Sequence, residues 1–375
     1  METTVLKALL KEGLEIANRI AVRSTQLPIL SNVLLSVEKE KVQLSATDLQ
    51  IGVVYRFLGT TRAGGAVVFP GHPLSALLSI SSGEQVSLLS KDRRLSVTTG
   101  EHRATLQALD AEEFPIIPSP QESELLTEID TATVCRALSQ VVGMTGQSQA
   151  RPEISGVLFT VMGKTASAAA TDSFRLAERR FSLEKETGRE QSFILPAKTV
   201  RELITILGER PGRAELYLSP AQVAFVYEAK ENPSRLRIQI VSRLIEGEYP
   251  RYQEVIPASH KTLVSLGKNE FLNHLRATGI FAGKAQEVRL LADPRKKAIE
   301  FFSENKEAGS HRSALRAEVE GDSVEVAFNW RFLMEGLVQM RGERVEFALN
   351  GEDGAALLRP SEQEGYLYVL MPIKA

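Results

Sequence analysis

Two aspartates in matching surroundings are the residues of this chain most able to do chemistry. Asp172 lies in AATDSFRLAERR, residues 169–180, and Asp48 lies in SATDLQIGVVYR, residues 45–56. A carboxylate in either place could act as a general acid or base, and the two could form a catalytic pair if they met in space. A Thr-Asp pair repeated at a strand end is more typical of an Asx-type turn, in which the aspartate accepts backbone hydrogen bonds. We therefore predict that both aspartates are structural.

The glycine, histidine and cysteine motifs give weaker evidence for catalysis than the two aspartates do. The run Gly163–Thr165 resembles the end of a phosphate-binding loop, but Leu158 stands where that loop needs its first glycine. We interpret Gly163 as the turn between two strands. The five histidines are scattered, and the single cysteine, Cys135, permits neither an intrachain disulfide nor a thiolate cluster. The sequence thus predicts no catalytic residue, no metal and no cofactor, and its cysteine usage fits a reducing cytoplasm.

The composition is that of a globular protein. Hydrophobic residues make up 43% of the 375 residues and charged residues 25%, with a net charge of −2. Such a balance permits nucleic-acid binding if the basic residues gather on one surface. No stretch approaches 18 consecutive apolar residues, and the first residues lack the apolar core of a signal peptide, so we expect no membrane partner.

The same order of predicted elements occurs three times along the chain. Each third opens with apolar residues at helical spacing and continues with alternating runs typical of strands, and a second helical pattern follows. The opening helices are predicted at 5–21, 131–144 and 268–283, and the second helical patterns lie in 67–80, 193–207 and 326–340. The strand pairs between them are predicted at 31–48, 156–172 and 287–304.

Proline-rich connections separate these thirds at 112–123 and 247–260. A chain of this length suggests two or three domains. We predict three similar α+β domains, each an antiparallel sheet plus two helices, because strands and helices recur in the same order. The predicted boundaries are residues 1–121, 122–257 and 258–375.

The predicted helices of all three thirds carry basic residues. These are Lys7, Lys11, Arg19, Arg136, Lys198, Arg201, Lys268, Arg276, Arg331 and Arg341. Two interpretations fit them: ordinary solvated helix faces, or one electropositive surface that would bind a phosphate backbone without reading sequence. The residues alone leave both interpretations open.

Six segments resemble one protein family, in the order in which that family has them. They are TQLPILSNVLLSVE (25–38), SATDLQIGV (45–53), ARPEISGVLF (150–159), AATDSFRLA (169–177), LIEGEYPRYQEVIP (244–257) and YLYVLMPIKA (366–375). Together they resemble the bacterial DNA sliding clamp, the β subunit of DNA polymerase III, over essentially the whole chain. The resemblance implies the DNA clamp fold and a processivity factor without catalytic activity.

The resemblance also implies partners. Two copies would form a head-to-tail homodimer, closing a ring of six domains with helices around the hole and sheets outside. The ring would encircle double-stranded DNA independently of sequence. DNA polymerase subunits and the clamp loader would bind through a short hydrophobic peptide that enters a pocket between the second and third domains.

The peptide pocket can be carried over residue by residue. Its residues here would be Ile154, Thr171, Ser173, Phe174, Arg175, Leu176, Pro250, Val255, Val369, Leu370, Met371, Pro372 and Ile373. The chain departs from the family at Phe174, where His or Tyr is frequent, and at Glu254, where some members have a basic residue. It ends in Lys374-Ala375 rather than an Arg-Leu type pair. These departures concern peptide preference, and Asp172 is expected to hold the pocket wall in shape.

Two further sets of residues follow from the resemblance. The DNA-binding residues would be Arg23, Ser24, Gln147, Gln149, Lys198 and Arg201. The dimer interface would contain Arg103, Ala104 and Leu106 of one copy, and Ile280, Phe281 and Glu304 of the other. Glu307 is a further candidate partner of Arg103.

Two alternatives compete with the clamp interpretation. The chain could be a hydrolase or transferase on a repeated α+β scaffold, with Asp48 and Asp172 as its acids. It could also be a monomeric module that binds peptides without encircling DNA. A dimer retained on circular DNA would exclude both.

Overall fold

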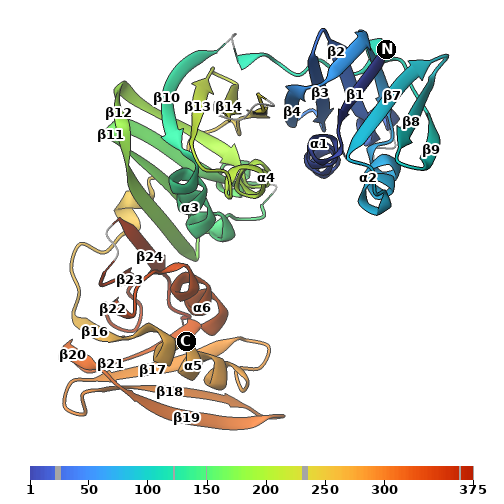
Figure 1. The fold of residues 1–375 in the computed structure, drawn as a ribbon. Coiled ribbons are helices and arrows are strands. Elements are labelled where there is room, and N and C mark those ends of the chain that lie inside the picture. The colour runs from blue at the N-terminus through green and yellow to red at the C-terminus, as the bar shows by residue number, and fades with distance from the viewer. Residues whose placement is uncertain (22–26, 121–122, 149, 230–234, 363–364, 375) are drawn as a thin grey trace. The chain divides into compact units, whose positions relative to one another are not determined.

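The computed structural model describes residues 1–21, 27–120, 123–148, 150–229, 235–362 and 365–374. Figure 1 shows the course of the chain, which divides into two compact units. Unit 1 comprises residues 1–135 and 201–244, and unit 2 comprises residues 136–200 and 245–375. Each unit is built around antiparallel sheets.

The larger sheet of unit 1 combines strands from the first and middle thirds of the chain. Its order is β10 (Glu124–Asp130), β13 (Arg213–Leu218), β14 (Gln222–Glu228), β15 (Arg237–Arg243), β4 (Ile51–Leu58), β3 (Lys41–Thr47), β2 (Val33–Glu38) and β6 (Gly65–Phe69). The antiparallel pairing of β15 with β4 joins the two thirds into one sheet. A second sheet has the order β5 (Thr60–Ala63), β1 (Glu2–Leu6), β7 (Gln85–Lys91), β8 (Arg94–Thr99) and β9 (His102–Gln107).

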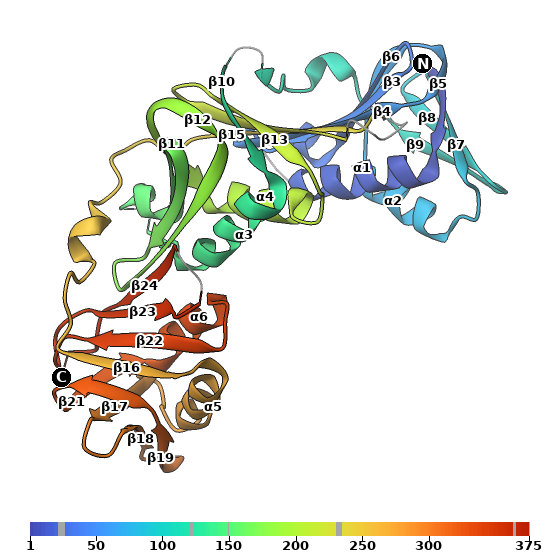
Figure 2. The ribbon, with the colours of Figure 1, turned by 60° about the vertical axis from the view of Figure 1, so that its left-hand side comes forward.

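Helix α1 (Lys7–Ile20) packs its apolar stripe onto β3 and β4 and lies beside α2 (Gly71–Ile80) (Figure 2). Its buried face includes Leu10, Leu14 and Ala17, which recur at helical spacing. Gly13 lies on the same face, and a Cβ there would come within 2.5 Å of the Tyr55 ring. Glycine is therefore required for this close approach of helix and sheet.

The larger sheet of unit 2 has the order β11 (Gly156–Thr171), β12 (Arg175–Pro196), β24 (Tyr366–Leu370), β23 (Ala356–Pro360), β22 (Arg344–Leu349), β16 (Thr262–Gly267) and β20 (Glu318–Gly321). Figure 2 shows β24, β23, β22 and β16 side by side. The pairing of β12 with β24 joins the middle and last thirds. The smaller sheet has the order β19 (Gly309–Arg316), β18 (Ala298–Asn305), β17 (Glu287–Asp293) and β21 (Val324–Asn329).

The helical predictions agree with the structure. Besides α1 and α2, the described residues contain α3 (Thr131–Val141), α4 (Ala197–Leu207), α5 (Lys268–Gly279) and α6 (Trp330–Gln339). Short 3-10 helices occur at η1 (Pro28–Ser31), η2 (Ala111–Glu113), η4 (Val142–Met144), η5 (Pro152–Ser155) and η6 (Tyr252–Val255). Apolar residues at helical spacing therefore located all six α-helices of the described chain.

The prediction of a turn at Gly163 is wrong. Gly163 lies inside the continuous strand β11, where the register with β12 shifts on either side of it. Its backbone adopts a φ of +57°, a left-handed conformation that favours glycine. The strand continues because β12 is long enough to pair with residues on both sides of the irregularity.

Candidate functional site

The Thr171–Arg175 turn joins β11 to β12. The Thr171 hydroxyl donates to the Arg175 carbonyl oxygen at 2.7 Å. Asp172 Oδ1 accepts from the backbone N–H groups of Phe174 (3.0 Å) and Arg175 (3.1 Å). Ser173 adopts a φ of +78°, which lets the chain reverse direction within the turn.

The turn between β3 and β4 repeats this arrangement. The Thr47 hydroxyl donates to the Ile51 carbonyl oxygen at 2.9 Å. Asp48 Oδ1 accepts from the N–H groups of Gln50 (2.9 Å) and Ile51 (2.8 Å), and Leu49 adopts a φ of +74°. The prediction of equivalent Asx-type turns is confirmed, and in both the aspartate oxygen is occupied by backbone donors.

Arg175 connects the second turn to α6. Its Nε donates to Asp172 Oδ2 at 2.9 Å and its Nη1 donates to Glu335 Oε2 at 2.5 Å. The guanidinium carbon lies 4.1 Å from the centre of the Phe332 ring. Burial alone would lower the pKa of Arg175, but Tyr368, Glu335 and Asp172 outweigh burial and raise that pKa. Arg175 is thus a charged anchor whose side chain is only 9% exposed.

Two tyrosines, Tyr249 and Tyr252, lie beside the Thr171–Arg175 turn, and Tyr249 bonds to it directly. The Tyr249 hydroxyl accepts from the Thr171 N–H at 3.2 Å, and the Tyr249 and Tyr252 rings meet edge to face with centroids 6.4 Å apart. Tyr252 donates its hydroxyl to Glu178 Oε2 at 2.5 Å, and Glu178 is buried. Burial raises the pKa of both tyrosines, so both hydroxyls remain protonated near neutral pH.

The tyrosine pair belongs to a buried apolar cluster, of which the sequence analysis assigned only Leu176 and Val369 to the site. The cluster comprises Ala169, Leu176, Ile194, Tyr249, Tyr252, Ala348, Leu357 and Val369. The two aromatic residues in the run EYPRYQ were a usable signal, because tyrosines in a linker that become buried must find partners for their hydroxyls.

Exposed apolar side chains lie around this cluster. Phe174 is 63% exposed, Val255 53% and Met371 38%. The Met371 N–H donates to the Phe174 carbonyl oxygen at 2.9 Å, so these two residues are adjacent. Of the two places where strands from different thirds pair, the second is that of β12 with β24. We call the surface formed there by Thr171–Leu176, Pro250–Val255 and Val369–Met371 the second-junction groove, after the peptide pocket that the resemblance predicts at these residues. Grouped exposed apolar residues of this kind are typical of an interaction surface.

The remaining residues of the predicted pocket have distinct positions in unit 2. Ile154 is buried in η5, Leu370 is buried in β24, and Pro372 is buried just beyond that strand. Ile373 leaves the turn, because its N–H donates to the Ala327 carbonyl oxygen of β21 at 2.8 Å. The structure therefore brings Leu176, Val369, Phe174 and Met371 together most directly.

The predicted DNA-binding and interface residues lie on separate elements. Arg23, Ser24 and Gln149 lie outside the described residues, whereas Gln147, Lys198 and Arg201 are exposed. Arg103, Ala104 and Leu106 lie on β9, an edge strand of the described sheets of unit 1. Ile280 is 73% exposed at the end of α5, and Glu304 is exposed on β18. The Phe281 ring stacks on the His311 ring, with the two ring centroids 5.8 Å apart.

The groups that could suggest other chemistry have structural surroundings. Burial raises the pKa of the Cys135 thiol to about 12, so the thiolate is not a ready nucleophile. The described ranges contain no group of His, Cys, Asp and Glu side chains arranged to hold a metal ion. None of the helices in these ranges is long and apolar enough to cross a membrane.

Comparison with known families agrees with this architecture along the chain. Residues 1–118 match the N-terminal domain of the DNA polymerase III beta subunit, residues 128–251 its central domain and residues 253–374 its C-terminal domain. The chain belongs to the DNA polymerase III beta subunit family. Members of this sliding-clamp family are non-enzymatic replication factors, which confirms the prediction of a protein without catalytic activity.

Individual clamps are similar over their full lengths. The chain is 27% identical to the beta sliding clamp of Caulobacter vibrioides and 26% identical to that of Pseudomonas aeruginosa, with 100% of both chains covered in each case. The solved sliding clamp of Bacillus subtilis aligns with a TM-score of 0.93 at 24% identity, covering 100% of this chain and 99% of that clamp. The Thermotoga maritima beta subunit aligns with a TM-score of 0.90 and the same coverage. The clamp fold of the sequence prediction is thus confirmed.

Proposed function

We propose that this clamp is a processivity factor that closes into a ring around duplex DNA and tethers its partners through the second-junction groove. The observation that carries the proposal is a strand pairing that recurs at two junctions within the chain. The same pairing rule leaves two edge strands for a second copy.

The rule can be stated from the three thirds. At the first junction β4, which follows a Thr-Asp turn, pairs with β15, the last strand of the next third. At the second junction β12, which also follows a Thr-Asp turn, pairs with β24, the last strand of the last third. The corresponding strands at the ends of this series are β19, which follows the turn after β18, and β9, the last strand of the first third.

Both β9 and β19 are edge strands in the described sheets. If β19 of one copy pairs with β9 of another, a heterologous contact forms, and two such contacts close a head-to-tail dimer. This pairing would also keep exposed strand edges from associating without limit. Leu106, Ile280 and Phe281 would supply apolar contacts, while Arg103 and Glu304 would add a rim ion pair of small energy.

Within such a ring, the basic helical residues would face DNA. Attraction to phosphates is independent of sequence and permits sliding, whereas contacts to base edges would hold the ring in place. Exposed Gln147, Lys198 and Arg201 are the proposed contacts among the described residues. A ring that acts on replicating bacterial DNA would work in the cytoplasm.

The second-junction groove is the proposed site for polymerase subunits and the clamp loader. Exposed Phe174, Val255 and Met371 surround a buried cluster, which suits a short peptide anchored by apolar side chains. A solved sliding clamp from Pseudomonas aeruginosa, 25% identical with a TM-score of 0.91, is bound to griselimycin. We also propose domains at residues 1–121, 122–257 and 258–375, close to the three matched family regions.

Two measurements test the ring. Analytical ultracentrifugation should give the mass of a dimer of the 41.3 kDa chain. Clamp loaded by a clamp loader onto nicked circular DNA should remain bound through gel filtration and dissociate once the circle is linearised. If the clamp stays bound equally well after linearisation, the ring proposal is wrong, because only a topologically bound ring is released at free DNA ends.

A further inference from the structure

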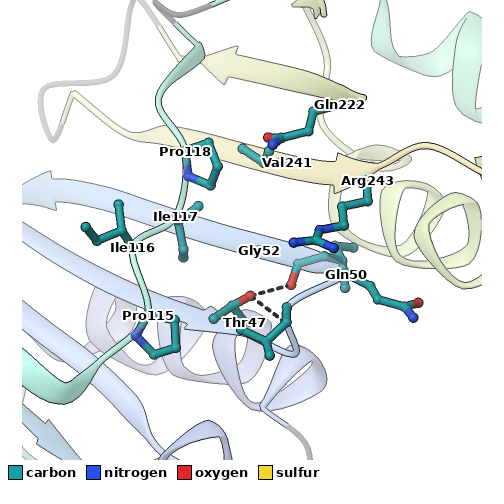
Figure 3. Close-up of a pocket in the computed structure, with 12 residues that line it drawn as sticks. Thr47, Gln50, Gly52, Pro115, Ile116, Ile117, Pro118, Gln222, Val241 and Arg243 are labelled. Atoms are coloured by element: carbon teal, nitrogen blue, oxygen red, sulfur yellow. Dashed lines mark hydrogen bonds between the residues drawn. The ribbon is translucent and has the colours of Figure 1, made fainter. Parts of the chain in front are cut away.

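The first junction contains a cavity of its own. It has a volume of about 120 Å³ and lies between the Thr47–Gly52 turn, the linker segment Pro115–Pro118 and the end of β15 (Figure 3). Figure 3 shows the linker crossing the strands and the Arg243 side chain pointing toward the turn. A space of this size accommodates one aliphatic side chain and is too small for a typical small-molecule ligand.

This cavity is the structural counterpart of the second-junction groove. Gly52 of β4 is paired with Val241, just as Leu176 of β12 is paired with Val369. The Arg243 N–H donates to the carbonyl oxygen of the turn residue Gln50 at 2.8 Å.

The same backbone bond occurs at the second junction, where the Met371 N–H donates to the Phe174 oxygen at 2.9 Å. Pro115 of the first linker corresponds to Pro250 of the second. Register, hydrogen bond and linker thus match at both junctions.

The side chains at equivalent positions differ in chemistry. Arg243 stands in the place of Met371, and Gln50 stands in the place of Phe174. Gly52 replaces Leu176, and Ile117 fills the space so released, because a Cβ on Gly52 would lie 3.0 Å from the Ile117 side chain.

The first-junction cavity is consequently basic and only partly apolar. None of its lining residues is Asp or Glu, and Arg243 forms no ion pair within the described ranges. Exposed apolar side chains remain at its edge, since Leu49 is 44% exposed and Ile116 is 93% exposed. An aliphatic group could thus be buried beside a cation.

We propose that this cavity is a second peptide site, which binds a short extended segment carrying an aliphatic side chain next to a carboxylate. The aliphatic group enters between Leu49 and the linker, while the carboxylate meets the Arg243 guanidinium, whose planar fork suits it. A single cation among prolines and aliphatic residues is a weak phosphate-backbone site, which favours peptide over nucleic acid. The choice of a peptide as ligand rests on the proposed function of the equivalent groove.

The test uses the full-length chain and a fluorescein-labelled peptide, Asp-Leu-Asp-Leu-Asp, followed by fluorescence anisotropy. Lys-Leu-Lys-Leu-Lys is the matched control peptide and should bind at least about tenfold more weakly. Arg243→Glu should weaken binding of the acidic peptide about tenfold. Arg213→Glu, an exposed change of the same charge on β13, should leave binding within about twofold.

A second variant tests the same site in case Arg243→Glu does not fold. Leu49→Asp should also weaken binding of the acidic peptide, and aspartate tolerates the positive φ at this position better than leucine does. Circular dichroism spectra of both variants should match that of the unaltered chain.

Three results would overturn the proposal. The acidic peptide could bind the Arg243→Glu variant as tightly as the unaltered chain. Its affinity could instead fall in Met371→Glu and not in Arg243→Glu, which would locate it in the second-junction groove. Arg243→Glu could weaken binding of a labelled DNA duplex and not of the peptide. A separate apolar peptide, Leu-Phe-Leu-Phe, tests the second-junction groove: its binding should weaken in Phe174→Ala. The proposals for the two sites can therefore be refuted independently.

Discussion

The turns at the two junctions have the same backbone conformation and hydrogen bonds, but they differ in the side-chain contacts that connect them to the rest of the fold. Each has a threonine hydroxyl on a carbonyl oxygen, an aspartate on two N–H groups and one residue in the left-handed region. At the first junction the fifth residue of the turn is Ile51, and at the second it is Arg175. Only Arg175 extends the turn by ion pairs to Asp172 and Glu335.

The two junctions show that a repeated backbone can carry surfaces of different chemistry. The turn bonds are local and independent of the side chains that face the junction, so they persist in both copies. The side chains at three equivalent positions then decide whether the surface is apolar, as with Phe174 and Met371, or basic, as with Arg243. Variants at equivalent positions therefore separate the two sites.

The largest effect is expected from removing the charged anchor. Arg175→Ala should lower the free energy of unfolding by about 3 kcal/mol, because it leaves Asp172 and Glu335 without their partner and removes the contact with Phe332. Urea denaturation measures the change. Ile51→Val, at the equivalent position, should cost about 1 kcal/mol, and equal losses at both positions would contradict the asymmetry.

Peptide binding should be the next most sensitive property. Phe174→Ala should weaken binding of an apolar peptide about tenfold, since an exposed aromatic ring of the groove is lost. Gln50→Ala, its counterpart at the first junction, should leave this binding unchanged. Isothermal titration calorimetry gives both affinities, and the dimer mass should be unaltered in each variant. A loss in Gln50→Ala of similar size would remove the distinction between the sites.

The aspartates should matter by smaller and unequal amounts. Asp48→Ala removes an acceptor of two backbone hydrogen bonds and should cost about 1 kcal/mol. Asp172→Ala also removes an ion pair with Arg175 and should cost about 2 kcal/mol. Thermal denaturation compares them. If the aspartate at the second junction were no more important than the first, the role given to Arg175 would be wrong.

The smallest effect concerns two histidines of the last third, His274 of α5 and His311 of β19. Burial and then His311 lower the pKa of His274 below its ordinary value, although Glu270 opposes this, and His274 Nδ1 bonds Ser313. The unfolded chain therefore binds a proton more readily than the folded chain. Stability should be fully present above pH 6.5 and decline as the pH falls through the lowered pKa. Melting temperatures between pH 7.5 and 5.5 should decline less in His274→Gln.

Much of the architecture was predictable because its signals are local. The α-helices appear in apolar residues at helical spacing, and Thr-Asp turns depend on bonds within five residues. The prolines near residues 115 and 250 marked both linkers. The resemblance selected Phe174, Leu176 and Met371, which the structure places together.

Other features depend on contacts between residues far apart in the chain. The roles of Tyr249 and Glu178 come from a hydrogen-bonded cluster, and the continuity of β11 through Gly163 comes from the length of its partner. The first-junction cavity exists because β15 pairs with β4 and brings Arg243 to the turn at Asp48. The order of elements within the three thirds and the two Thr-Asp turns follow from the local sequence, since hydrogen bonds between near neighbours need little chain closure. Sheet pairing across the junctions selected which side chains meet, because such pairing is settled by packing between distant segments.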